Sequence, residues 1–289
     1  MRHHAVTHVA THLLTLTCPD RPGIVAAVAQ GLLELGANIV ESAQFGDVTT
    51  STFCMRTRFD VAIDDASEVQ TAMRESAAML QADLVVRRWD RPTRTLVMVS
   101  SYDHCLVDLL YRWRAGELPI EIPLVVSNHP DLGPLVERTG VDFEHVPVTP
   151  QTKPAAEARL LDLVTSQRID LVVLARYMQV LSDEVCRQFA GRAINIHHSF
   201  LPGFKGARPY HQAWTRGVKV IGATAHYVTA DLDEGPIIDQ DVARVSHALG
   251  PDEMRVAGRD VERMVLARAV KAHAEGRVFL LGGRTVVLP

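Results

Sequence analysis

Two polar side chains stand at the end of an apolar run in the second half of the chain. The segment 193–198 reads Ala-Ile-Asn-Ile-His-His and leads into a loop rich in proline and glycine. Such a run predicts a buried strand, on which side chains two positions apart share a face. Asn195 and His197 would then point the same way, about 7 Å apart along the strand, while His198 would point the other way. An amide donor and an imidazole in this arrangement could stabilise an oxyanion as it forms.

An acidic turn follows a later alternating run, residues 220–228. The turn covers residues 230–238 and contains Asp231 and Asp233. A carboxylate here could reach the same cleft as His197, hold the imidazole in its charged form, and orient or deprotonate a water molecule. Taken singly, a histidine on an apolar strand often has only a structural hydrogen bond, and an aspartate in such a turn often only shapes it. The three residue types together favour catalysis.

The neighbouring histidines His197 and His198 do not predict a metal site. Adjacent strand residues face opposite ways, and no HExxH pattern or third ligand cluster accompanies the pair. We therefore expect neither a metal nor a cofactor. The cysteines have no CxxC or zinc-finger spacing, which predicts reduced thiols. They are Cys18, Cys54, Cys105 and Cys186.

The region that must position these side chains alternates strand-like and helical runs. Strands are predicted at residues 95–101, 120–127, 142–148, 170–175 and 193–198. A helical stretch at 154–167 separates two of them. This alternation predicts a Rossmann-like, mostly parallel sheet with helices on both faces, in which ligands bind beyond the carboxyl ends of the strands. Asn195 and His197 lie at such an end.

The beginning of the chain has a different order of elements. Strands are predicted at residues 11–18, 37–45, 52–59 and 84–88, and helices at 24–35 and 66–82. The resulting order is βαββαβ, a ferredoxin-like arrangement. Residues 91–94, Arg-Pro-Thr-Arg, predict a linker. The expected fold class is therefore α/β, with a first domain at residues 10–90 and a second at 95–289.

Composition narrows the range of partners. The chain has 289 residues, a formal net charge of -4 and 47% apolar residues. No block of lysine or arginine stands out, and neither a long apolar run nor a secretory leader pattern occurs. These properties disfavour nucleic acid and membranes as partners and favour a small molecule. We expect a soluble protein of the cytoplasm.

The stretch 17–25, Thr-Cys-Pro-Asp-Arg-Pro-Gly-Ile-Val, followed by Gly-Ala-Asn-Ile at 36–39, resembles the start of an ACT domain. The resemblance implies a small amino-acid effector, with methionine or glycine as candidates, at the turn after the first strand and at a subunit interface. Asp20, Gly23 and Asn38 are the candidate ligand residues. Because ACT modules tend to pair, the resemblance also implies a homo-oligomer. Alternatively, Gly23 only permits a tight turn and Asn38 only begins a strand.

The motif Asn-Ile-His-His-Ser-Phe-Leu-Pro at 195–202, followed by Asp-Leu-Asp-Glu-Gly-Pro at 231–236, resembles the formyltransferase family that uses 10-formyltetrahydrofolate. The resemblance implies that Asn195, His197 and Asp233 are catalytic, with Asp231 a turn residue. It also implies a folate-binding set from two loops. These residues are Met178, Gln179, Val180, Leu181, Thr229 and Leu232.

Two features of the sequence bear on the acceptor of the formyl group. Residues 99–106 contain no glycine, where transformylases acting on glycinamide ribonucleotide have a glycine-rich phosphate loop. The added domain and basic surface of methionyl-tRNA formyltransferases do not appear in this sequence. An ACT domain ahead of the catalytic domain, with His104-Cys105-Leu106 after its first strand, resembles the formyltetrahydrofolate deformylases. That resemblance implies hydrolysis of 10-formyltetrahydrofolate to formate and tetrahydrofolate.

Several roles stay open at this point. His104 could line the site of the attacking water. Lys205 and Arg208 could attract the glutamate tail of folate or only carry surface charge. Formyl transfer to a small amine, and a regulator that binds folate without catalysis, are the alternatives to hydrolysis.

Overall fold

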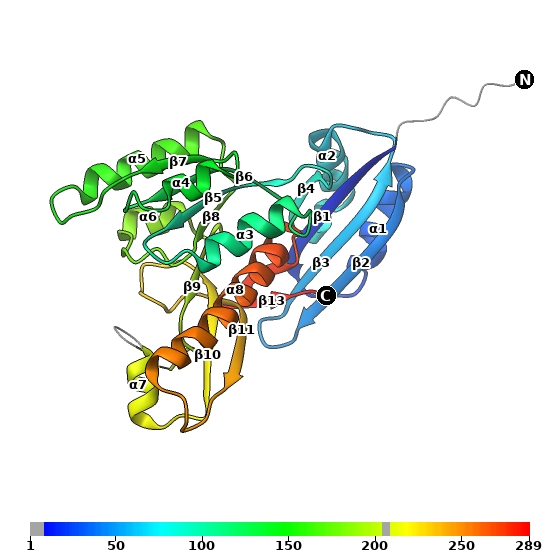
Figure 1. Ribbon diagram of the computed structural model, residues 1–289. Helices are drawn as coiled ribbons and strands as arrows, with labels where there is room; N and C mark the ends of the chain where they lie inside the picture. Colours follow the sequence, from blue (N-terminus) through cyan, green and yellow to red (C-terminus); the bar gives the residue numbers. More distant parts are fainter. Residues whose placement is uncertain (1–8, 204–208) are drawn as a thin grey trace, which may run out of the picture. The chain divides into compact units, whose positions relative to one another are not determined.

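The computed structural model describes residues 9–203 and 209–289. The chain divides into two compact units (Figure 1). One comprises the part of the chain up to Pro92 together with residues 276–281 and 286–289, and the other runs from Thr93 to Glu275 and includes residues 282–285. Lys205 and Arg208 lie outside the described residues.

The first unit is built around an antiparallel sheet of four strands. Its elements are β1 (Ala10–Pro19), α1 (Ile24–Glu34), β2 (Asn38–Asp47), β3 (Thr52–Val61), α2 (Ala66–Ser76), the 3-10 turn η1 (Ala78–Leu80) and β4 (Asp83–Arg88). The strands are arranged β2-β3-β1-β4. Both the predicted βαββαβ order and the ferredoxin-like class are confirmed.

Local sequence explains the helix boundaries of this unit. Gly23 precedes α1 with a φ of 94°, a left-handed conformation that glycine adopts without strain. Asp65 caps α2, because its side chain accepts a hydrogen bond from the backbone N–H of Ser67. The inward sides of both helices pack on the sheet through a fully buried apolar core. Its members include Leu14, Leu16, Val28, Leu32, Met55, Phe59, Val69 and Met73.

The C-terminal hairpin extends the first unit. Strands β12 (Val278–Leu281) and β13 (Arg284–Val287) pair with each other. Phe279, Leu281 and Leu288 form a buried cluster with Cys54 of β3. Because this cluster covers apolar area of the sheet, residues 276–281 and 286–289 group with the first unit, although the sequence pattern assigned them to the second domain.

The second unit contains a sheet of seven strands. Its strands are β5 (Thr93–Val99), β6 (Ile120–Ser127), β7 (Asp142–His145), β8 (Leu171–Leu174), β9 (Ala193–His197), β10 (Val220–Tyr227) and β11 (Ile237–Arg244). They are arranged β11-β10-β9-β8-β5-β6-β7. The five strands from β9 to β7 are parallel, and β10 and β11 add antiparallel partners at one edge. The predicted mostly parallel sheet is confirmed.

Helices pack on this sheet and fix the strand ends. They are α3 (His104–Arg114), α4 (Gly133–Glu137), α5 (Lys153–Ser166), α6 (Asp183–Gln188), α7 (Pro209–Arg216) and α8 (Pro251–Ala274). Helices α5 and α6 build a core with β5 and β8, whereas α8 packs along β9, β10 and β11 and against α3. Among the described residues, no helix is long and apolar enough to cross a membrane.

Candidate active site

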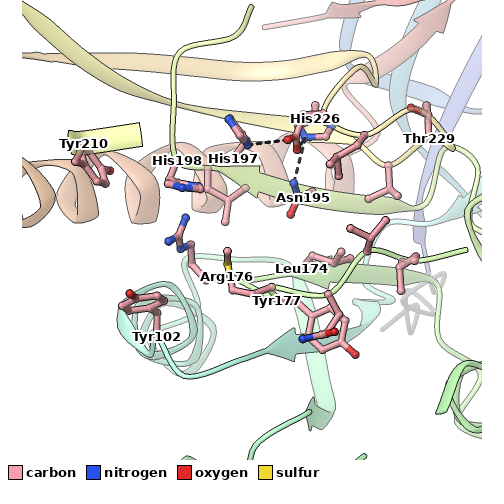
Figure 2. Close-up of a pocket in the computed structure, with 18 of the residues that line it drawn as sticks. Tyr102, Leu174, Arg176, Tyr177, Asn195, His197, His198, Tyr210, His226 and Thr229 are labelled. Atoms are coloured by element: carbon pink, nitrogen blue, oxygen red, sulfur yellow. Dashed lines mark hydrogen bonds and ion pairs between the residues drawn. The ribbon is translucent and has the colours of Figure 1, made fainter. Parts of the chain in front are cut away.

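A cavity of about 650 Å³ lies in the second unit where β8 and β9 end (Figure 2). Much of its wall comes from three segments at the ends of strands. The segment from Leu174 to Leu181 follows β8, the segment from Asn195 to His198 ends β9, and the segment from Val228 to Asp233 follows β10. The cavity therefore lies at the carboxyl edge of the parallel strands, where the sequence predicted a ligand site.

The structure brings Asn195, His197 and Asp233 together in this cavity. The Nδ1 atom of His197 lies 3.2 Å from Oδ2 of Asp233. The Nδ2 atom of Asn195 lies 3.2 Å from Nε2 of His226. This Nε2 atom of His226 also lies 3.7 Å from Oδ1 of Asp233. Four polar groups from β9, β10 and the following loop thus form one cluster.

Backbone geometry accounts for this convergence. Alternation along β9 places Asn195 and His197 on one face. Strand β10 runs antiparallel to β9 with His226 directly opposite Asn195. Asp233 has a φ of 57°, a left-handed conformation that aspartate tolerates better than most residues. This turn directs its carboxylate back towards the strand end.

The electrostatics of Asp233 favour its charged form. Burial raises the pKa of its carboxyl group, but hydrogen bonding to His197 and the longer contact with His226 outweigh burial and hold the pKa well below its usual value. The group therefore stays ionised at physiological pH. A carboxylate of this kind is a strong partner for an imidazolium and a weak base on its own.

His197 retains one unused polar atom. Its side chain is only 6% exposed. While Nδ1 faces Asp233, Nε2 is buried and has no hydrogen-bond partner among the described residues. Leaving a buried polar nitrogen unpaired costs about 1–3 kcal/mol, which indicates that a ligand atom completes its environment. The cavity supplies the space for that ligand.

The predicted folate-binding residues line the other wall of the cavity. Met178, Gln179, Val180 and Leu181 all face it, and so do Thr229 and Leu232. The loop after β8 is fixed by its backbone, since the N–H of Met178 donates to Ser100 Oγ at 2.9 Å and Ser100 donates to Asn128 at 2.6 Å. This wall combines apolar side chains with a constrained main chain, as expected of a site for a flat aromatic ring.

Two histidines lie elsewhere than the sequence predicted. His198 was expected to point away from His197, but it lines the cavity, with its ring centroid 5.1 Å from that of His197. Strand β9 ends at His197, so the alternation of faces no longer applies one residue later. His104 does not line the cavity, because its Nε2 turns to Glu262 at 2.8 Å.

Several polar residues at the site were missed by the sequence reasoning. Those that line the cavity are Tyr102, Arg176, Tyr210 and His226, and Glu262 lies behind them. His226 had a usable signal, since it alternates with apolar residues on a strand next to the one that carries Asn195. Arg176 and Glu262 had none, because they are separated by many residues and meet only through the packing of α8.

In the first unit, the three candidate effector residues do not meet within one chain. Asp20 follows β1 and lies near Gly46 of β2. Asn38 begins β2 at the other end of the sheet. There Asn38 pairs with Asp60 of β3, which also pairs with Thr11 near the start of β1. From Thr11 to the end of β1 the chain advances roughly 26 Å at about 3.3 Å per residue. Gly23 stands with Asp20 at the end distant from Asn38.

Comparisons with known families agree with this division into units. The family model described as formyl transferase matches residues 93–270, and the model described as ACT domain matches residues 11–87. A protein of Corynebacterium sp. (strain P-1) named formyltetrahydrofolate deformylase is 52% identical over 281 residues, covering 96% of this chain and 98% of that protein. The protein of the same name from Escherichia coli K12 is 42% identical over 279 residues, with the same coverage.

Solved structures give the same result. A formyltetrahydrofolate deformylase from Burkholderia mallei superposes with a TM-score of 0.92 at 48% identity, covering 96% of this chain and 99% of the other. A glycinamide ribonucleotide transformylase from Symbiobacterium toebii superposes with a TM-score of 0.65 at 33% identity, covering 69% of this chain and 95% of the other. The second match shows that a related catalytic fold occurs in proteins named for an amine acceptor.

Proposed function

The chain belongs to the formyltetrahydrofolate deformylases, hydrolases that convert 10-formyltetrahydrofolate to formate and tetrahydrofolate, and we propose that Asn195, His197 and Asp233 carry out this reaction. The observation that carries the proposal is the 3.2 Å contact between His197 and Asp233 beside Asn195 in one cavity.

Asn195 and His197 stabilise the oxygen of the formyl group. When water adds to the formyl carbon, that oxygen becomes negative and needs donors aimed at it. Asn195 has two amide hydrogens, of which one goes to His226. The other, together with Nε2 of a protonated His197, is available to the oxyanion. This role uses the atom of His197 that otherwise has no partner among the described residues.

Asp233 acts on His197 and on the attacking water. Its lowered pKa keeps it negative, so it accepts hydrogen bonds from His197 and from water. The water oxygen forms a bond to the formyl carbon, its proton passes through Asp233 and His197 to N10, and the carbon–nitrogen bond breaks. Tetrahydrofolate leaves as the amine and formate leaves as its anion, with one proton released to solvent. The low pKa makes orientation, rather than independent base strength, the larger contribution of Asp233.

Folate binds along the wall that faces these groups. The backbone of Met178, Gln179, Val180 and Leu181 offers hydrogen bonds to the pterin ring, and the apolar side chains of the loop cover its face. Thr229 and Leu232 close the ring site from the loop after β10. The ring then extends from this wall towards N10 beside His197.

Formate release tests the assignment. The whole protein is incubated with 10-formyltetrahydrofolate, with a chelator and without an amine, and formate is measured for wild type and for Asp233→Asn. Formate from wild type and at least about 100-fold less from the variant is the expected result. Equal release by both proteins would remove Asp233 from the mechanism, and no release by wild type would overturn the hydrolytic function.

The ACT unit suggests a small-molecule effector, and we propose that it is an amino acid, methionine or glycine, bound by Asp20 and Gly23 of one chain and Asn38 of a second. Because these residues lie at opposite ends of the sheet in one chain, a second copy is needed to join them. Strand β2 lies at an edge of the sheet and exposes Ile39, Val40 and Phe45, as expected of a strand that pairs with another copy.

Light scattering and kinetics test this arrangement. We expect the wild-type protein to be an oligomer and Phe45→Lys to shift it towards the monomer. Millimolar methionine or glycine should change the hydrolysis rate of wild type and lose this effect in Asn38→Ala. A monomeric wild type, or kinetics and melting temperature unchanged by both amino acids, would contradict the proposal.

We also infer that the enzyme works in the cytoplasm. All four cysteines are buried and free. Unpaired thiols are the usual state in a reducing compartment. Cell fractionation with an antibody against the protein would check the location.

A further inference from the structure

The cavity has a second end that the folate assignment does not use. Tyr102, Arg176, His198 and Tyr210 line it, together with Asp252 and Arg255 at the beginning of α8. Figure 2 shows the guanidinium of Arg176 directed from the loop after β8 towards His198. Its walls are aromatic and charged, in contrast to the apolar loop at 178–181. A ligand group held here would be small and polar.

Arg176 is built into this end of the cavity. Its side chain is only 8% exposed, and its guanidinium lies over the ring of Tyr102 at 5.2 Å from the centroid. Its φ is 64°, a left-handed conformation that costs a non-glycine residue about 1 kcal/mol. Buried Glu262 supplies the counter-charge, with Oε2 at 3.4 Å from Nε of Arg176. A buried cation on a strained backbone is a costly arrangement that calls for a functional reason.

Glu262 satisfies only part of the hydrogen-bonding capacity of Arg176. Tyr210 donates to Oε1 of Glu262 at 2.6 Å, and His104 contacts Oε2 at 2.8 Å. Burial raises the pKa of Glu262, but the hydrogen bond with His104 and the charge of Arg176 outweigh burial, so the carboxylate is ionised. Nε of Arg176 nevertheless has no hydrogen-bond partner among the described residues. Because Nε faces Glu262, the guanidinium is held in place electrostatically, and its two Nη groups are the donors directed towards another group in the cavity.

The surrounding residues do not supply that group. Arg255 is paired with Asp252 at 3.0 Å. Burial and the charge of Arg176 lower the pKa of His198 to about 3, so its ring is neutral. Within the described chain, Arg176 is therefore the cation at this end whose charge is directed at the cavity.

A metal ion is a poorer fit to the same cluster. His104, Cys105 and Glu262 place their ligand atoms within 4.8 Å of one another. However, the cation of Arg176 already lies beside the same carboxylate oxygen and would repel a second cation. Burial also raises the thiol pKa of Cys105 well above its usual value, which disfavours the thiolate that a metal needs.

We propose that Arg176, positioned by Glu262, forms a binding site for a small carboxylate, and that formate released by the reaction occupies it. The inference rests on the proposed function, because hydrolysis produces a carboxylate beside His197, whose ring is adjacent to that of His198. A guanidinium binds a carboxylate through two parallel hydrogen bonds. The same positive charge disfavours an ammonium acceptor at this position.

Product inhibition measures occupancy of the site. Hydrolysis by the whole protein is followed with increasing sodium formate, while sodium chloride keeps the ionic strength constant. Formate should inhibit wild type. In Arg176→Gln the inhibition constant should rise about tenfold or more, as expected for loss of a charge-assisted pair. Arg263→Gln is the matched control on α8, at a residue that does not line the cavity, and should keep its inhibition constant, because Arg263 is half-exposed and paired with Asp260.

A second measurement does not depend on turnover. Formate should raise the melting temperature of wild type and of Arg263→Gln but not of Arg176→Gln, and Arg176→Lys, which keeps the charge but lacks the planar pair of donors, should give an intermediate shift. Equal effects of formate and chloride on wild type, or unchanged formate inhibition in Arg176→Gln, would overturn the proposal while leaving hydrolysis intact. A wild type that releases no formate would instead contradict the proposed function.

Discussion

Two pairs of a histidine and a carboxylate in the second unit invite comparison. His197 meets Asp233 at 3.2 Å, and His104 meets Glu262 at 2.8 Å. Asp233 lies on the wall of the cavity, whereas Glu262 is 1% exposed and serves His104, Tyr210 and Arg176 at once. The shorter contact is thus the one further from the proposed chemistry.

The difference shows that contact geometry alone does not identify a catalytic pair. Both histidines keep a buried nitrogen without a hydrogen-bond partner among the described residues, Nε2 in His197 and Nδ1 in His104, but of the two only His197 lines the cavity, where a ligand can reach it. In the second pair, both oxygens of the Glu262 carboxylate already contact other side chains, and the carboxylate holds those side chains in place. We therefore expect mutations of the first pair to affect rate and mutations of the second to affect stability.

The largest effect should come from removing the imidazole of His197. His197→Gln should lower kcat/KM for 10-formyltetrahydrofolate by about 10²–10⁴-fold, because an oxyanion donor and proton-transfer group is lost. His104→Gln is the matched change in the other pair and should lower kcat/KM by less than about tenfold while reducing the melting temperature. A His104 variant as impaired in rate as the His197 variant would return His104 to the substrate site.

The next largest effect should be on stability at Glu262. Glu262→Gln should reduce the free energy of unfolding by about 3–5 kcal/mol, because Arg176 becomes a buried charge without compensation. Asp233→Asn makes the same chemical change in the other pair and should cost less than half as much, since its surroundings open to the cavity. Urea unfolding of both variants checks this, and a larger loss for Asp233→Asn would reverse the comparison.

A smaller effect is expected when a single hydrogen bond of Glu262 is removed. Tyr210→Phe removes a donor to a buried carboxylate and should cost about 2 kcal/mol. Tyr227 is the control, since its hydroxyl lies 2.7 Å from Nδ1 of His273 and not beside a carboxylate, and Tyr227→Phe should cost about 1 kcal/mol. Equal losses in thermal or urea unfolding would indicate that the charge of Glu262 adds nothing to its hydrogen bonds.

The sequence predicted one of these two pairs and not the other. Asn195 and His197 follow from the period of a strand, and Asp233 from a turn next to it, so local pattern and a family resemblance were sufficient. Glu262 lies on a helix far along the chain, and nothing local distinguishes a buried glutamate from the exposed ones beside it. Its partners meet through the packing of α3, α7 and α8.

The fold divides in the same way. The order of elements in both units followed from hydrophobic periodicity, and the antiparallel strand β10 places His226 opposite Asn195. The face of His198 was predicted wrongly, because β9 ends at His197, one residue before the predicted end of the strand. The C-terminal hairpin packs in the first unit because Phe279 and Leu281 are buried there. The periodicity of a strand does not predict which part of the protein buries it.

The smallest effect concerns His198. Its ring lies between the two histidine–carboxylate pairs, with its centroid 5.1 Å from that of the His197 ring and 6.2 Å from that of the Tyr210 ring. Its pKa is lowered to about 3 in the folded chain by burial and by Arg176, whereas the unfolded value is about 6.5. In this pH range the unfolded chain binds a proton at His198 and the folded chain does not. The contribution of His198 to the free energy of unfolding is therefore complete above pH 6.5 and is lost as pH falls from there towards 3. Between pH 7 and 5.5 the loss should be about 1 kcal/mol. Comparing urea unfolding of wild type and His198→Asn at both pH values isolates the contribution of His198. An identical pH dependence in the two proteins would mean that His198 is protonated in the fold. Its charge would then be set by Asp233 rather than by Arg176.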